Sequence, residues 1–250
     1  RITTMQHIEE RHCLNCNAII SKDSKFCSKC GAKTHVSEVN HRKEIQKFLA
    51  AFLANALYIL GLYLIKIDSN YVNALILDGV FFISTLILAI LFINDLKPFV
   101  QFRKLSILKT MHYFEIQILL TAGVILLSPI LTDLFDLKDA NIIAPYVDAP
   151  LPLLTAILSM AIFPAITEEL SFRAILFTQL EKLTSGYSTV IVTGLLFALV
   201  HFSFISFIWL IPMGLYLGWI RLREKTIWYG VSCHFLHNFI VIFIDYFDLY

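Results

Sequence analysis

The chain has 250 residues, of which 58% are hydrophobic and 16% are charged. Soluble domains are about 45–50% apolar and about 25% charged, so this composition excludes an ordinary soluble protein and predicts an all-α polytopic membrane protein. The formal net charge of +1 gives no sign of a nucleic-acid partner, and we expect none. Residues 1–47 are polar and lack a cleavable apolar core, so no signal peptide is expected. Because the chain begins with Arg1, Met5 is a candidate for the natural start.

Four of the five cysteines form two CxxC pairs separated by ten residues: Cys13, Cys16, Cys27 and Cys30. Each pair aims two thiolates at one point, and two pairs complete a tetrahedral Zn²⁺ site. A unit of about 25 residues cannot build a sufficient core, so metal has to supply its folding energy. We therefore predict a small N-terminal zinc ribbon over residues 11–35 with one structural zinc. Two disulfides are the alternative, which a reducing cytoplasm disfavours.

A basic linker, 36–47, leads to seven apolar segments at about 48–67, 72–94, 113–131, 151–180, 187–202, 204–220 and 227–247. Most are close to the ~20 residues that a membrane-spanning helix needs. We predict about seven transmembrane helices, in two groups over 48–131 and 150–247. The fifth and sixth segments nearly touch at the sequence HFSF, which leaves open a tight hairpin or one helix with a break.

Lys and Arg gather near alternate ends of the predicted spans. They are frequent before the first span, in the second loop and in the last loop: Arg42, Lys43 and Lys47, then Lys97, Arg103, Lys104 and Lys109, then Arg221, Arg223 and Lys225. The other loops are poor in positive charge, and the acidic stretch before residue 151 carries only Lys138. The positive-inside rule therefore predicts a cytoplasmic N-terminus and zinc ribbon, and a C-terminus outside.

The sequence FPAITEELSFRAIL, residues 163–176, places ionisable side chains inside an apolar segment. Glu168 and Glu169 are neighbours, so on a helix they point about 100° apart. Glu169 and Arg173 have the i,i+4 spacing at which acid and base meet on one face. We expect Arg173 to neutralise Glu169, which leaves Glu168 available as a general base. The alternative is that this helix surfaces early and places these groups among lipid headgroups.

Two later segments carry polar side chains at the same i,i+4 spacing. FALVH contains Phe197 and His201, and HFLHN contains His234 and Asn238. Counted from the cytoplasmic end of each span at 1.5 Å per residue, Glu168, His201 and Asn238 lie about 18, 21 and 16 Å deep, and His234 about 10 Å deep. A lone membrane histidine often only links two helices. Three spans that carry such groups at similar depth predict one site between the fourth, fifth and seventh spans.

These three motifs fit EExxxR, FxxxH and HxxxN, in that order. Over about residues 150–245 the chain thereby resembles the CAAX prenyl endopeptidase and bacteriocin-processing (CPBP, ABI) family of intramembrane proteases. The spacer GLYLGWIRLREKTIW looks like the glycine-rich sixth helix and basic loop of that family. Each motif alone is weak, whereas three in order on separate spans are a strong match. The zinc ribbon and the first three spans lie outside the resemblance.

The resemblance implies a role for each motif residue. Glu168 would be the general base that activates a water molecule, and His201 would help to hold that water. Glu169 would be positioned by Arg173.

The third motif would supply the oxyanion contacts. His234 and Asn238 would donate hydrogen bonds to the oxyanion that forms when water attacks a peptide carbonyl. Phe197 looks like a packing residue, and His237, which has no counterpart in the motifs, is expected to be structural or to support a neighbouring site residue. The sequence leaves open whether the site binds a catalytic Zn²⁺, because two glutamates and two histidines are a suitable ligand set for zinc. The absence of HExxH slightly favours metal-free, glutamate-activated water.

We therefore predict an intramembrane endopeptidase that hydrolyses a peptide bond of a membrane-associated protein or peptide precursor in the lipid bilayer. One alternative is a non-proteolytic bacteriocin-immunity or regulatory protein of the same fold. Another is a proton-coupled transporter, against which no internal repeat relates the two halves of the chain. Complete motifs favour catalysis, because a pure binder needs no buried acid set. A zinc ribbon fused to such a protease indicates a bacterial plasma membrane.

Overall fold

The computed structural model describes residues 10–13, 16, 18–21, 27–31, 41–64, 70–102, 104–136, 141–203 and 205–247. Residues 36–40 of the predicted linker, Arg103 and Lys138 lie outside these ranges. The chain divides into two compact units, Arg1–His41 and Arg42–Tyr250, which are described one at a time.

The first unit contains a two-stranded antiparallel hairpin. Strands β1 (Glu10–His12) and β2 (Ile19–Ser21) pair with Arg11 opposite Ile20. The Cys13 amide donates to the Ala18 carbonyl at 2.8 Å, which extends the pairing of the two strands by one bond. After the second pair, Gly31 adopts a φ of 71°, a left-handed conformation that glycine enters without a steric cost. The Gly31 amide donates to the Cys27 carbonyl at 2.9 Å, which closes a turn around the second cysteine pair.

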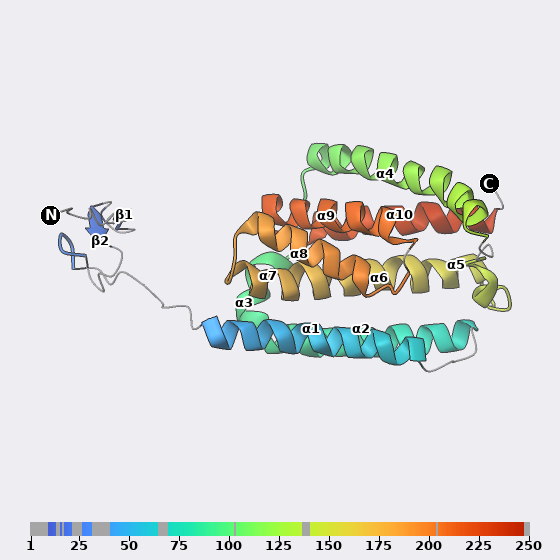
Figure 1. Cartoon of the computed structure of the whole chain (residues 1–250), viewed down its shortest axis with the longest axis horizontal. Coiled ribbons are helices and arrows are strands. Elements are labelled where there is room, and N and C mark those ends of the chain that lie inside the picture. Colours follow the sequence, from blue (N-terminus) through green and yellow to red (C-terminus); the bar gives the residue numbers. More distant parts are fainter. Residues whose placement is uncertain are drawn as a thin grey trace. The chain divides into compact units, whose positions relative to one another are not determined.

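The second unit is a bundle of helices (Figure 1). Its elements are α1 (His41–Leu64), α2 (Tyr71–Leu91), α3 (Ile93–Val100), α4 (Ile107–Leu134), η1 (Ala144–Tyr146), a helical segment over 152–181, α8 (Gly186–Leu199), α9 (Phe207–Glu224) and α10 (Trp228–Tyr246). Side chains mark several helix starts: Asn70 caps α2 and Ser185 caps α8 through bonds to backbone amides. The segment over 152–181 runs through the middle of the bundle, in contact with α2 on one side and α10 on the other.

The helix boundaries correct two expectations. Residues 41–47, predicted as part of a linker, form the first two turns of α1, because Arg, Lys, Glu and Gln are good helix formers. The predicted span 72–94 ends at Leu91, and the loop expected after it contains the short helix α3. Pro98 sits inside α3, and a proline shortens helices because it lacks an N–H group.

The fold class is confirmed as an all-α polytopic membrane protein with a small zinc ribbon. Among the described residues, three helical segments are long and apolar enough to cross a membrane: Tyr71–Leu91, Ile107–Leu134 and Pro152–Glu181. Helix α8 has 14 residues and is therefore about 21 Å long, shorter than the ~30 Å hydrocarbon core. The count of seven spans stays a prediction.

The sequence HFSF forms the tip of a hairpin between α8 and α9, not a break within one helix. The two helices approach so closely that a Cβ atom on Gly214 would lie 2.7 Å from the Gly194 carbonyl oxygen. Figure 1 shows the hairpin turning partway along the bundle. His201, at the tip, is thereby brought toward the middle of the bundle. If neither arm of the hairpin spans the membrane, the number of spans falls from seven to five, and the predicted sides of the termini do not change.

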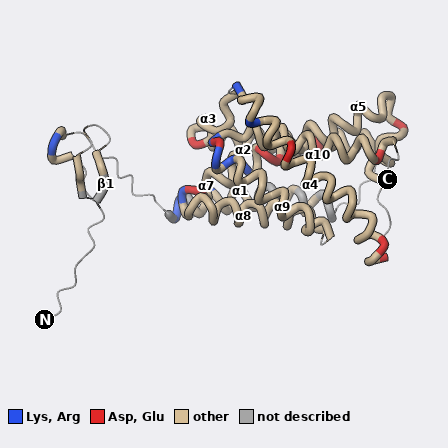
Figure 2. The backbone as a smooth tube through the Cα atoms, turned by 90° about the horizontal axis from the view of Figure 1, so that it is seen from above, with Lys and Arg blue, Asp and Glu red and all other residues tan. Residues whose placement is uncertain are grey.

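Basic side chains collect at one end of this unit. Three ion pairs join its loops and helix ends there: Lys182–Asp95 at 2.7 Å, Lys109–Glu224 at 2.7 Å and Lys225–Glu181 at 2.9 Å. Figure 2 shows Lys and Arg toward the end with α3 and α7, whereas the end near α5 and the C-terminus is coloured by Asp and Glu. The predicted basic segments thus share one end, as the positive-inside rule requires; which side of the membrane they face stays a prediction.

Candidate functional site

The helical segment that carries the first motif is distorted twice. It consists of α5 (Pro152–Ile157), a π-helical stretch η2 (Leu158–Ile162), α6 (Phe163–Glu168), a second π-helical stretch η3 (Glu169–Leu176) and α7 (Phe177–Glu181). π-helical turns are rare and occur often at functional sites. Here Glu168 and Glu169 stand at the junction of α6 and η3, which separates the environments of the two carboxylates.

Glu169 and Arg173 form a buried ion pair, as their spacing predicted. Arg173 Nη1 lies 2.9 Å from Glu169 Oε1, and the two side chains are 1% and 0% exposed. Arg173 Nη2 donates to the Gly214 carbonyl at 3.1 Å, and its guanidinium carbon lies 4.3 Å from the centre of the Phe197 ring. Arg173 therefore ties the first motif helix to both arms of the α8–α9 hairpin. These contacts place Glu169 and Arg173 inside the bundle and not on its outer surface.

His234 lies between the two glutamates. Its Nδ1 is 3.2 Å from Glu169 Oε1, and its Nε2 is 3.8 Å from Glu168 Oε2. A carboxylate accepts hydrogen bonds, so Nδ1 carries a proton that it donates to Glu169, while Nε2 lies beyond hydrogen-bond distance of Glu168. A Cβ atom on Gly230 would lie 2.8 Å from Glu169 Oε2. A glycine one turn before His234 thus makes room for the carboxylate that orients this histidine.

His201, at the hairpin tip, is held by the last turn of α8. Its Nδ1 lies 2.8 Å from the Phe197 carbonyl oxygen, which can only accept, so this nitrogen carries the proton and Nε2 is an acceptor. The buried Phe197 ring lies 5.0 Å from the His201 ring and 6.0 Å from the His234 ring, measured between centres. The expectation that Phe197 packs beside His201 is confirmed, and the same ring also separates the two histidines.

Asn238 bonds to a carbonyl that the sequence leaves free. Pro164 has no N–H to offer the carbonyl of Met160, four residues earlier, and Asn238 Nδ2 donates to that oxygen at 2.9 Å. Within the described part of the chain, the second N–H of the amide donates to no protein acceptor. Next to it, His237 Nδ1 contacts Thr121 Oγ1 at 2.9 Å, which joins α10 to α4, in keeping with its expected structural role.

A cavity of about 420 Å³ joins these groups. Four of the predicted residues line it: Glu168, His201, His234 and Asn238. Glu169 and Arg173 do not line it and lie buried behind His234. The predicted site is therefore brought together, with four side chains at the cavity and an ion pair that supports them.

The cavity also has walls that the motifs did not indicate: Asp78 from α2, Tyr146 from η1 and Ser159 from η2. Asp78 was visible in the sequence as a charged residue inside an apolar segment. Nothing in the sequence located Tyr146 or Ser159.

The four cysteines of the first unit fit a zinc ion. Cys13 Sγ lies 3.7 Å from Cys30 Sγ, and Cys16 Sγ lies 3.6 Å from Cys27 Sγ. Four thiolates in a tetrahedron around zinc, with bonds of about 2.3 Å, have sulfur atoms about 3.8 Å apart. The described ligand atoms of all four cysteines lie within 4.8 Å of one another, so this set suits a structural zinc and the metal would stabilise the folded ribbon.

The cavity does not offer a comparable zinc site. Of the side chains described, the cysteines alone form a set of three or more candidate ligands within 4.8 Å of one another. One nitrogen of His201 is held by Phe197, and one nitrogen of His234 by Glu169, which leaves Nε2 of each ring as the atom that could bind a metal. As they are arranged, the ligand atoms of Glu168, His201 and His234 do not all lie within 4.8 Å of one another.

A helical membrane bundle with carboxylates, histidines and an amide around an internal cavity defines a membrane-embedded protein with a polar internal site. Residues 150–240 match the family model of the type II CAAX prenyl endopeptidase Rce1-like proteins, and residues 12–34 match a zinc-ribbon domain. The resemblance drawn from the three motifs is confirmed in that residues 150–240 match this family model, and the zinc-ribbon match precedes them. No curated protein and no solved structure gave a match.

Proposed function

We propose that the protein is an intramembrane endopeptidase that cleaves a peptide bond of a membrane-associated protein or peptide precursor. One observation carries the proposal. Side chains from two helical segments and the α8–α9 hairpin tip, Glu168, His234 and His201, face one cavity although 66 positions separate Glu168 from His234. An acid–histidine set of this kind suits a water molecule activated for attack. The family match over residues 150–240 supports the same reaction class.

In this mechanism Glu168 and the free Nε2 of His201 hold the water between them. The water oxygen bonds to the peptide carbonyl carbon while its proton passes to Glu168. The tetrahedral intermediate then collapses, the carbon–nitrogen bond breaks, and Glu168 returns the proton to the leaving amine. One product ends in a new carboxyl group and the other in a new amino group.

The remaining polar groups stabilise the oxyanion or orient the His234 ring. Asn238 keeps one N–H after its bond to Met160, and we assign the oxyanion contact to it. His234 donates from Nδ1 to Glu169, so its Nε2 becomes an oxyanion donor only when the ring carries a second proton. Glu169, held by Arg173, fixes the orientation of the ring. This assignment narrows the role that the resemblance implied for His234.

The test compares new protein N-termini in cells that produce the wild type or Glu168→Gln at matched membrane levels. The substitution keeps size and hydrogen bonding while it removes the base, and it should lower cleavage about 100-fold or more. Glu115→Gln, at a carboxylate that is 72% exposed on α4, is the matched control and should leave every cleavage product in place. Identical N-termini in all three strains, with both variants able to replace the wild type in a deletion strain, would contradict proteolysis and favour an immunity or regulatory protein.

A further inference from the structure

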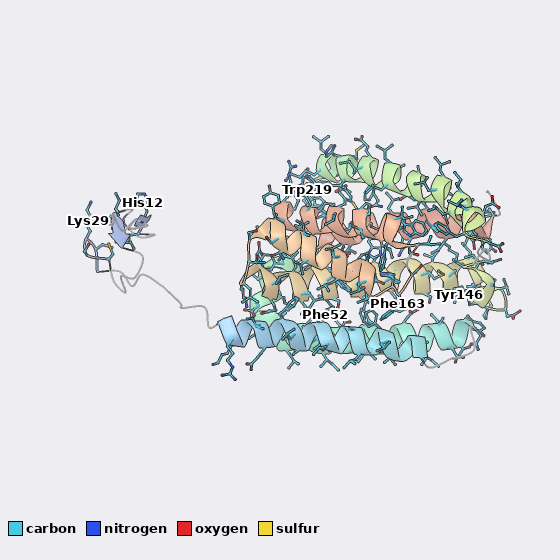
Figure 3. All side chains as sticks on the ribbon, viewed as in Figure 1. His12, Lys29, Phe52, Tyr146, Phe163 and Trp219 are labelled. Atoms are coloured by element: carbon cyan, nitrogen blue, oxygen red, sulfur yellow. The ribbon has the colours of Figure 1, made fainter. Side chains whose placement is uncertain are left out.

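The cavity continues beyond the groups that the proposed mechanism uses. Asp78, Ser159 and Tyr146 line it together with Glu168. Tyr146 is labelled in Figure 3 near the α5 end of the bundle. Ser159 and Glu168 are nine positions apart on one helical segment, about 13 Å along its axis at 1.5 Å per residue. The cavity is therefore long enough for a peptide segment to extend from the cleavage site toward Asp78.

Asp78 is the end point of a chain of hydrogen bonds. The Tyr146 hydroxyl donates to Ser159 Oγ at 2.9 Å, and the Ser159 hydroxyl donates to Asp78 Oδ2. A hydroxyl has one proton to donate, and both protons are directed toward the carboxylate. Ser159 and Tyr146 are 3% and 5% exposed, so neither hydroxyl is free to turn to bulk water. This arrangement suits an ionised Asp78 that acts as an acceptor.

No described cation pairs with this carboxylate. Arg173, the nearest guanidinium to the motif glutamates, is bonded to Glu169 behind the cavity wall. An ionised carboxylate inside a membrane protein is costly without a counter-charge. Asp78 and Glu168 together make the cavity negative. If the bond between Ser159 and Asp78 served only to join η2 to α2, any acceptor at position 78 would be sufficient. A neutral amide such as that of Asn accepts a hydrogen bond equally well, so a purely structural bond does not explain the charge.

We propose that Asp78 binds a basic side chain of the substrate, so that the protease selects peptides with a Lys or Arg near the cleaved bond. An extended peptide rises about 3.3 Å per residue, so 13 Å corresponds to about four residues between the basic side chain and the bond that is cleaved. Asp78 thereby determines specificity and does not take part in bond cleavage. This inference rests on the proposed endopeptidase function.

The first experiment uses full-length protein in lipid nanodiscs and apolar fluorogenic peptides in matched pairs. Each pair carries either Lys or its neutral analogue norleucine, placed two to six residues to either side of the cleaved bond. We expect the wild type to favour the Lys peptide by about 30-fold in kcat/KM at a spacing near four, through KM and not through kcat. Asp78→Asn should reduce that preference to about threefold or less. Asp78→Lys should favour the same peptide with Glu in place of Lys.

Asp148→Asn is the matched control, because Asp148 is an exposed aspartate two positions after Tyr146. It should keep the full preference for Lys. A Lys preference that survives Asp78→Asn would overturn the inference. So would an equal loss of cleavage of both peptides in Asp78→Asn, since that result describes a purely structural contact.

A binding measurement separates this inference from the proposed function. The same fluorescent peptides are titrated onto Glu168→Gln and onto the Glu168→Gln, Asp78→Asn double variant. If the wild type cleaves no peptide but Glu168→Gln still binds the Lys peptide more tightly through Asp78, the endopeptidase proposal falls and the cation subsite stands. If cleavage occurs but neither binding nor cleavage depends on Asp78, the subsite falls and the endopeptidase proposal stands.

Discussion

Glu169 and His234 are 65 positions apart in the chain and meet inside the bundle, with Glu169 Oε1 3.2 Å from His234 Nδ1. The same carboxylate oxygen lies 2.9 Å from Arg173 Nη1. One oxygen therefore joins the first motif to the third. The carboxylate both neutralises a buried guanidinium and fixes which nitrogen of the histidine faces Glu168.

Because Glu169 and Arg173 form this buried ion pair, we expect the effects of their substitutions on the free energy of unfolding to be strongly non-additive. Glu169→Gln leaves the fully buried Arg173 without a counter-charge and should lower the free energy of unfolding by about 3–5 kcal/mol. The double variant Glu169→Gln, Arg173→Met should lose clearly less than the sum of the two single variants. Thermal unfolding in nanodiscs measures all three. Glu181→Gln, which breaks the partly exposed pair with Lys225, is the control and should cost no more than about 1 kcal/mol. Strict additivity would contradict the coupling.

Gly230 should be required for activity even though it contacts no substrate in the proposed mechanism. In Gly230→Ala the new methyl group would lie 2.8 Å from Glu169 Oε2, so the carboxylate and His234 must shift. A displacement of about 1 Å at a catalytic group can cost about 100-fold in rate. We expect kcat to fall at least tenfold with KM little changed. Gly123→Ala, with open space around the added methyl group, is the control; equal activity in both variants would show that the contact is relieved elsewhere.

The zinc ribbon should hold one zinc ion per chain, and proteolysis should not need a second. Metal analysis of the purified protein should give one zinc, lost in Cys27→Ser because three thiolates no longer close the site. Cys233→Ala should keep it, since this cysteine is buried in α10. Cleavage of a test peptide by the wild type should survive a chelator that removes the ribbon zinc. A second zinc that disappears in His201→Ala would contradict the metal-free mechanism.

Asp95 should stabilise the basic end of the bundle in a pH-dependent way. Burial raises the pKa of the Asp95 carboxyl, but hydrogen bonds from Lys182 and Gln179 outweigh burial and hold the pKa below its ordinary value. A lowered folded-state pKa gives stability that is present above the unfolded value of about 3.9 and is lost as the pH falls through the folded value. Asp95→Asn should therefore unfold at a lower temperature than the wild type at pH 7, with the difference closing below about pH 4.

Two comparisons check this assignment. Added salt should narrow the difference at pH 7, because the Asp95–Lys182 pair is partly exposed. Asp133→Asn, at an exposed aspartate near the end of α4, should unfold like the wild type throughout. If the difference in unfolding temperature between Asp95→Asn and the wild type stayed constant from pH 7 to pH 3, the effect would come from altered packing or hydrogen bonding and not from the charge of Asp95.

The sequence by itself determined the fold class, the zinc-binding cysteines and four of the polar residues of the cavity. These conclusions follow from local chemistry: apolar runs of membrane length, thiolates in CxxC pairs, and the i,i+4 spacing of Glu169 with Arg173. Such patterns depend on neighbours in the chain, and a helix converts spacing into a shared face. The helix α3 and the start of α1 were missed, because short amphipathic or charged helices leave no long apolar run.

The tertiary structure decided what each of these residues faces. Only packing shows that His234 points its Nδ1 to Glu169, that Asn238 uses the carbonyl left free by Pro164, and that a hairpin tip brings His201 to the cavity. It also placed Asp78, from a helix outside the matched domain, on the same cavity wall as Glu168. Contacts between segments 60 to 100 residues apart depend on how the helices pack, and no spacing along the chain contains that information.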